Sequence, residues 1–450
     1  MKELLNIAKK RIIPSDPEQK DMSDFVKLLK NATTSKYNPI VCGSVGKSTW
    51  LAHRREADIF LLFSPDLTKK QLEIQGLKEG KKIVKKLKGK WKLAYSEHPY
   101  LQALFTFRKK QYEVDIVPAF AIKNSSNIKS AVDRTPHHMK FILKNLKNNN
   151  DVRLLKQFCI AHECYGADLK VLGFSGYLCE LLIVKYKTFS SCIKAVSKWK
   201  PGKTIIVGKQ SPTKKFSTPL VVIDPVDPSR NVAAVVSEEK FFTFVQACQK
   251  FLASPSMKHF FPPEVKPIAL TDLKKKINKR KTKLLLFSFK KPKSLEDILW
   301  AQTRKLNKLL ERKLQKDDFT ILKKGTWMDK KQITLVFEVD NWVVSKVKKQ
   351  IGPDIKSKAA SLFLKHYKNK KVSVERGRYV VEVPRKRTQV LPYMKDFFIG
   401  TAKKLHSKGV PSRLASPMTK ARIEMFPDKS LVLKSHPEDF FKFLQKWFKR

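Results

Sequence analysis

The 450-residue sequence lacks any long hydrophobic run, and no apolar stretch approaches the ~18 uninterrupted residues of a membrane-spanning helix. Its first residues are charged and amphipathic, without the apolar segment of a signal peptide. CxxC pairs are also missing among its six cysteines, which favours buried, reduced thiols over a metal site. We therefore expect a cytoplasmic protein that does not enter a membrane.

Acidic residues are scarce relative to basic ones. The chain has 94 Lys and Arg against 40 Asp and Glu, which gives a formal net charge of +54. Such an excess repels itself in the folded state, so a polyanionic partner is the natural explanation. The basic residues are spread along the whole chain, which predicts a large, folded, basic surface. A lysine-rich genome or a saline habitat would also add to the charge, and the sequence does not separate these contributions.

Three of the few acidic residues stand inside apolar, β-prone runs. Glu56 and Asp58 are two residues apart and therefore project from one face of a strand. Asp115 lies in a later run of the same kind, with Glu113 two residues before it as a competitor for the same role. Carboxylates on neighbouring strands form the oxygen cage that Mg²⁺ prefers. The pattern predicts a two-metal site for phosphoryl or nucleotidyl transfer, with Glu56, Asp58 and Asp115 as metal ligands and catalytic residues.

A tight turn precedes these acids. Gly43 and Ser44 follow a short apolar run, and exposed backbone N–H groups, the Ser44 hydroxyl and Lys47 could hold a triphosphate there. The segment 45–49 partly matches the Walker A pattern, but Val41 stands where that pattern requires a glycine. The sequence therefore argues against a P-loop NTPase.

The chain divides into three predicted parts, all folded: residues 1–148, 149–264 and 265–450. The first part predicts a broken helix over 1–31 and then an α/β region, and the second is mostly helical. Pro262, Pro263 and the basic run after them indicate a boundary near residue 265. In the third part the pattern predicts strands and helices in an α+β arrangement. Its expected strands are 283–289, 319–324, 332–338, 371–375 and 378–383, and its expected helices are 295–315, 353–368 and 390–407.

With these residues in place, a family resemblance emerges. Gly43, Ser44, Glu56, Asp58 and Asp115 resemble the palm of the DNA polymerase beta-type nucleotidyltransferases. Longer runs resemble the archaeal, class I CCA-adding enzymes, which are tRNA nucleotidyltransferases. These runs are 44–51, 97–100, 127–138, 153–156, 165–167, 173–182 and 226–234. The likeness is dense from about residue 40 to 255 and thin after 265.

The resemblance implies further site residues and partners. Ser44, Lys47, His138, Lys156 and Tyr165 match positions that contact the triphosphate or sugar of the incoming nucleotide. Thr135 would neighbour that pocket, and Arg230 matches an arginine that helps to choose C or A. The implied partners are CTP, ATP, Mg²⁺ and the acceptor stem and T-arm of tRNA, and a homodimer is compatible with the sequence.

The implied fold is a multidomain α/β protein. It comprises a nucleotidyltransferase palm with a mixed sheet, a helical central domain and an α+β C-terminal RNA-binding domain. Its implied activity is template-independent addition of CCA to tRNA. Two alternatives stay open: a poly(A) polymerase or oligoadenylate synthetase-like enzyme, and a non-catalytic tRNA- or ribosome-binding protein.

Overall fold

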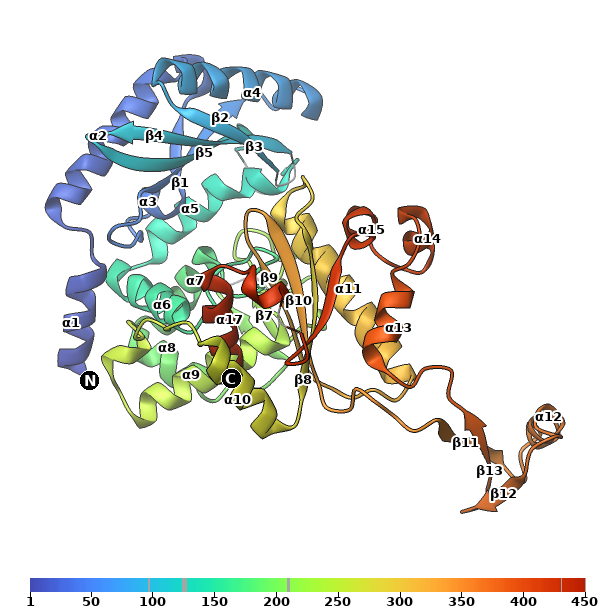
Figure 1. Ribbon diagram of the computed structural model, residues 1–450. Coiled ribbons are helices and arrows are strands. Elements are labelled where there is room, and N and C mark those ends of the chain that lie inside the picture. The colour runs from blue at the N-terminus through green and yellow to red at the C-terminus, as the bar shows by residue number, and fades with distance from the viewer. Residues whose placement is uncertain (96–97, 124–127, 209–210, 430, 450) are drawn as a thin grey trace. The chain divides into compact units, whose positions relative to one another are not determined.

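The protein comprises two compact units, Met1–Pro263 and Glu264–Arg450 (Figure 1). A computed structural model describes the chain except for residues 96–97, 124–127, 209–210, 430 and 450. No helix within the described ranges is long and apolar enough to cross a membrane. The division of the first unit at residue 148 stays a prediction.

A five-stranded mixed sheet organises the start of the first unit, in the order β1-β2-β5-β4-β3. Strands β2 and β5 run parallel, and the other neighbours are antiparallel. The strands are β1 (Ile40–Cys42), β2 (Glu56–Phe63), β3 (Lys90–Tyr95), β4 (Pro99–Phe107) and β5 (Lys110–Phe120).

The two faces of this sheet differ because side chains alternate along each strand. Helices α2 (Asp16–Ala32) and α4 (Lys69–Lys86) cover the apolar face. Gly76 and Gly80 of α4 allow this close packing, since a Cβ on Gly76 would lie 2.4 Å from the Pro118 side chain and one on Gly80 2.8 Å from that of Leu101. The opposite face carries the predicted carboxylates.

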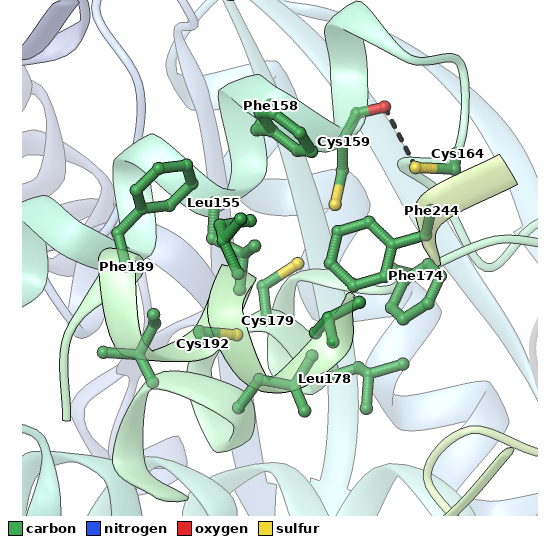
Figure 2. Packing of buried hydrophobic residues seen from close by; sticks show 14 of the residues in the cluster. Leu155, Phe158, Cys159, Cys164, Phe174, Leu178, Cys179, Phe189, Cys192 and Phe244 are labelled. Carbon is green, nitrogen blue, oxygen red and sulfur yellow. Dashed lines mark hydrogen bonds between the residues drawn. The ribbon is translucent and has the colours of Figure 1, made fainter. Parts of the chain in front are cut away.

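The rest of the first unit is mainly helical and has its own core. Phe158, at its centre, packs against the rings of Phe189, Phe244 and Phe251, and buried Cys179 and Cys192 lie among the apolar side chains (Figure 2). All six cysteines are buried and unpaired, as the composition predicts. The remaining elements of this unit are α1 (Lys2–Ile12), α3 (Gly43–Gly46), α5 (Arg134–Asn145), α6 (Asn149–Ala161), α7 (Gly176–Tyr186), α8 (Phe189–Val196), β6 (Lys203–Ile206), β7 (Leu220–Ile223) and α9 (Glu238–Ala253).

The second unit has two antiparallel sheets, in the orders β14-β8-β10-β9 and β11-β13-β12. The four-stranded sheet packs against α11, whose apolar stripe includes Leu299, Leu306 and Leu310. The elements are α10 (Leu270–Arg280), β8 (Lys283–Lys290), α11 (Glu296–Lys316), β9 (Ile321–Met328), β10 (Gln332–Val339), β11 (Val347–Asp354), α12 (Ala360–His366), β12 (Val372–Glu375), β13 (Arg378–Pro384), α13 (Val390–Phe397), α14 (Ala402–Ser407), α15 (Ser412–Met418), β14 (Arg422–Phe426), α16 (Leu431–Lys434) and α17 (Glu438–Lys449).

The predicted fold class is confirmed, with two errors of detail in the second unit. The helix predicted over 353–368 is mostly wrong, because β11 occupies Val347–Asp354 and the helix α12 is short. The single helix predicted over 390–407 is two helices, α13 and α14. Gly400 lies between them with a φ of 128°, a conformation that a helix cannot contain.

Candidate active site

Asp58 and Asp115 lie side by side on the open face of the first sheet. Strands β2 and β5 are paired so that Asp58 is the direct neighbour of Asp115 and Glu56 is the direct neighbour of Glu113. Residues two apart in a strand share a face, so all four carboxylates belong to the same face. The register therefore brings together the acids that the sequence pattern singled out.

The electrostatics of this pair favour a cation. Burial, reinforced by the charge of Asp58, raises the pKa of Asp115 to about 6. Burial also raises the pKa of Asp58, while Lys47 opposes that shift. Two half-desolvated carboxylates side by side disfavour each other's charge, and a divalent ion would remove that penalty.

The predicted third ligand stands apart from this pair. The Glu56 side chain is 61% exposed, and its carboxylate lies 3.8 Å from the guanidinium of Arg54. Among the described residues, no three His, Cys, Asp or Glu side chains are grouped closely enough to hold a metal ion. Asp58 and Asp115 fit Mg²⁺ by their chemistry as hard oxygen donors, whereas Glu56 would have to leave Arg54 to join them.

Gly43, the first residue of α3, lies directly against Asp58. Its φ is 62°, and a Cβ built on it would lie 1.7 Å from Oδ2 of Asp58. No other residue type fits here, so the glycine has a steric reason beyond its backbone conformation. Ser44 follows it in the first turn of α3 and lines a small pocket beside the sheet.

That pocket collects several of the predicted nucleotide-binding residues. Its lining includes Ser44, Thr49, Arg54, Glu56, Lys156 and Tyr165. Burial raises the pKa of the Tyr165 phenol, which stays protonated and can donate a hydrogen bond. Gly176, the first residue of α7, leaves room for this phenol, because a Cβ there would lie 3.2 Å from the Tyr165 oxygen.

A buried carboxylate joins the two predicted phosphate-binding lysines. Glu180 in α7 accepts from Lys47 at 2.5 Å, from Thr49 at 2.7 Å and from Lys156 at 3.4 Å. Lys156 also donates to the Thr49 hydroxyl at 3.0 Å. Burial alone would raise the pKa of Glu180, but the two lysines outweigh it and the pKa is lowered. Glu180 thus holds both ammonium groups in place from beneath the pocket.

A second buried carboxylate organises the other predicted residues. Asp224 accepts from His138 Nε2 at 2.8 Å, from Arg230 Nη1 at 2.7 Å and from the Tyr177 hydroxyl at 3.2 Å. Since a carboxylate only accepts, the proton of neutral His138 must sit on Nε2. The rings of His138 and Tyr177 are stacked, with centroids 4.1 Å apart. His138 and Arg230 are therefore parts of one cluster, although they come from distant segments.

Thr135 is half-buried in the first turn of α5, near His138. Asp133 anchors the start of this helix by accepting from the backbone N–H groups of Phe120 at 2.9 Å and Ser130 at 2.7 Å. Two residues of the matching runs, Glu97 and Asn127, lie outside the described residues.

Sequence reasoning missed the two organising carboxylates, Glu180 and Asp224, as site residues. Glu180 interrupts the otherwise apolar run of α7, and a charged residue that is 1% exposed needs a partner. Asp224 is also fully buried and directly follows the buried strand β7. In both cases the sequence signal was a single acidic residue within or directly after an apolar run, which indicates a buried carboxylate.

Comparison with known proteins decides the family. The model for "tRNA nucleotidyltransferase, second domain" matches residues 150–261, and that for "CCA-adding enzyme, C-terminal domain" matches 280–409. The CCA-adding enzyme of Methanosarcina acetivorans is 34% identical over 411 residues, covering 90% of this chain and 87% of that protein. The chain belongs to the CCA-adding enzyme family.

Other members of the CCA-adding enzyme family agree. The Methanosarcina mazei enzyme is 38% identical, covering 77% of this chain and 76% of its own length, and the Archaeoglobus fulgidus enzyme is 34% identical, covering 84% and 85%. Outside this family, the solved structure of mtPAP is 11% identical, with a TM-score of 0.43 over 56% of this chain and 68% of that one, and the family assignment does not rest on it. The resemblance seen in the sequence is therefore confirmed by family members and reaches into the second unit.

Proposed function

We propose that this enzyme adds CCA to the 3′ end of tRNA from CTP and ATP, without a nucleic-acid template. The observation that carries the proposal is the register of Asp58 against Asp115, directly opposite the Gly43–Ser44 turn. A carboxylate pair beside the start of α3 suits attack of an RNA 3′-hydroxyl on the α-phosphate of a nucleotide, with pyrophosphate as the leaving group. The family membership supplies the substrate class.

The residues divide the work of binding and orientation. Ser44, Lys47 and Lys156 hold the triphosphate, and Glu180 keeps the two lysines in place. Tyr165 donates from the pocket wall, and Thr135 and His138 border the nucleotide from α5. Asp58 and Asp115, joined by Glu56, would hold two Mg²⁺ ions, which when bound supply Lewis acidity and neutralise phosphate charge.

Arg230 is our candidate for the choice between C and A. Its guanidinium is held by Asp224, so its free N–H groups are fixed in direction and can donate to a base edge or an RNA phosphate. A guanidinium that is held in place distinguishes C from A better than a mobile one. When the wrong base offers no acceptor, a fixed guanidinium cannot rotate to form a replacement hydrogen bond.

The second unit supplies a basic groove for tRNA. Asp317 and Asp396 are the two acids in its lining, which also carries the aromatic rings of Tyr367 and Tyr393. Its basic residues are Lys313, Lys316, Lys348, Lys370, Arg385, Lys386, Arg387 and Lys408. We propose that this groove binds the acceptor stem and T-arm through phosphates and shape rather than sequence. Cytoplasmic location and a homodimer stay predictions.

Incubation with labelled CTP and ATP and a tRNA that lacks its CCA end tests the function. The expected product is longer by three nucleotides and ends in A. A long A tract would instead support a poly(A) polymerase-like enzyme, and tRNA binding without pyrophosphate release a non-catalytic protein. Asp58→Asn and Asp115→Asn should each lower turnover by at least about 10³-fold while tRNA still binds; normal turnover in either would refute the site.

A further inference from the structure

One row of side chains crosses the whole first sheet on its open face. The strand registers align Cys42 with Asp58, Asp58 with Asp115, Asp115 with Gln102, and Gln102 with Lys92. Gln102 Nε2 donates to Asp115 Oδ1 at 3.2 Å, so the row is in contact next to the acids. A second row of side chains lies beside the first on the same face. In this row Glu113 is the neighbour of Leu104, and Leu104 is the neighbour of Lys90. The sheet thus carries two lysines, Lys90 and Lys92, on the edge strand β3, which we call the rim, on the same face as Asp58 and Asp115.

The two ends of these rows differ in what surrounds them. At the β1 end, Gly43 packs against Asp58 and the turn to Ser44 begins, so that end is built for the triphosphate. At the β3 end the sheet is open: Lys90 and Lys92 are exposed on an edge strand, and Leu104 beside them is 40% exposed. Within the described part of the chain, neither lysine side chain has a hydrogen-bond or ion-pair partner.

The reaction brings the nucleoside triphosphate and the RNA 3′ end together at Asp58 and Asp115, and the triphosphate occupies the β1 side. The RNA strand that carries the attacking hydroxyl then approaches over β4 and β3. Two strand spacings separate Asp115 from Lys92, which is about 10 Å, and a lysine side chain reaches back over most of that distance. The last backbone phosphates before a 3′-terminal nucleoside fall within this span.

We propose that Lys90 and Lys92 bind backbone phosphates of the RNA strand whose 3′-hydroxyl lies at Asp115. This inference rests on the proposed function. Lysine is a point charge that holds a phosphate without reading a base, which suits a site that must accept an end growing from C to CC. The intervening residues Trp91 and Leu93 project from the opposite face, where Lys81 of α4 lies over the Trp91 ring at 5.0 Å, and they take no part.

The test compares Lys92→Glu and Lys90→Glu with Lys85→Glu. Lys85 is an exposed lysine near the end of α4, on the helix that covers the other face, so it carries the same charge change away from the acids. KM and kcat are measured for tRNA lacking CCA and, separately, for CTP. We expect kcat/KM for tRNA to fall about 10-fold or more in the rim variants with KM for CTP unchanged, and Lys85→Glu to stay within twofold of the parent.

Two further readings separate charge from structure. Lys92→Arg keeps the charge and should behave like the parent enzyme. The slope of log Kd for tRNA against log salt should fall by about one in Lys92→Glu. Equal effects in Lys92→Glu and Lys85→Glu, or a raised KM for CTP, would overturn the inference. A parent enzyme that adds no CCA would instead overturn the proposed function.

Discussion

Gly43 occupies the position in the site with the least room for a side chain. Gly43→Ala should lower kcat/KM by about 10²-fold or more, because the new methyl group would push Asp58 from its place beside Asp115. Gly202→Ala is the matched control, since Gly202 has a φ of 84° and open space around its missing Cβ. It should cost about 1 kcal/mol of stability and leave turnover intact. Equal losses of activity in both variants would contradict the steric account.

Glu180 is the residue on which the lysine pair depends. Glu180→Ala leaves two buried ammonium groups without their carboxylate, which should cost about 3–5 kcal/mol of stability, measured by urea unfolding. At temperatures where the variant is folded, KM for CTP should rise about 10-fold. Glu338→Ala removes a comparably buried carboxylate from Arg280 and Thr282 in the second unit and should destabilise without changing KM for CTP.

At the scale of elements, Asp224 joins the end of β7 to α5 and α7. Burial alone would raise its pKa, but the hydrogen bond from His138 and the others lower it to about 2, from an ordinary 3.8. Because the folded pKa is below the unfolded one, the stabilisation is present above about pH 4 and is lost as the pH falls toward 2. The difference corresponds to about 2 kcal/mol.

Asp224→Asn should therefore have a lower free energy of unfolding than the parent at pH 6. The difference between the two proteins should become smaller between pH 4 and pH 2. Urea unfolding of both proteins across this range measures it. A gap that is constant with pH would mean that the carboxylate charge contributes nothing at this junction.

The elements also show what sequence alone could predict. The two strands that carry Asp58 and Asp115 were predictable because apolar residues mark a strand strongly where one of its faces is buried. Strand β11 was missed because Gly352 is its only buried residue, so its pattern carries no apolar face. At the site, Asp58 and Asp115 were predictable from strand spacing. Glu180, in contrast, bonds Lys156 and Lys47, which are 24 and 133 residues away, and Asp224 bonds His138, which is 86 residues away, and no local pattern reveals these partners.

For the whole molecule, we expect charge to govern tRNA binding. The net charge of +54 and the groove of the second unit predict that many phosphates are contacted at once. Raising NaCl from 50 to 200 mM should weaken tRNA binding by about 10³-fold or more, measured by filter binding. The double variant Lys386→Glu, Arg387→Glu in that groove should reduce the salt slope by about two. A binding constant that hardly responds to salt would contradict phosphate-dominated recognition.

The buried thiols have a practical consequence for measuring the distance between the two units. The thiolate is the nucleophile that attacks a thiol-reactive dye. Burial raises the pKa of Cys42 to about 12 and leaves all six thiols shielded from solvent. The native chain should therefore resist maleimide labelling while it is folded. Cysteines introduced at the exposed positions Lys85 and Lys274, one in each unit and both outside the proposed binding sites, would then be the fast-reacting positions. A donor–acceptor dye pair could therefore report the distance between the units during catalysis without removing a single natural cysteine.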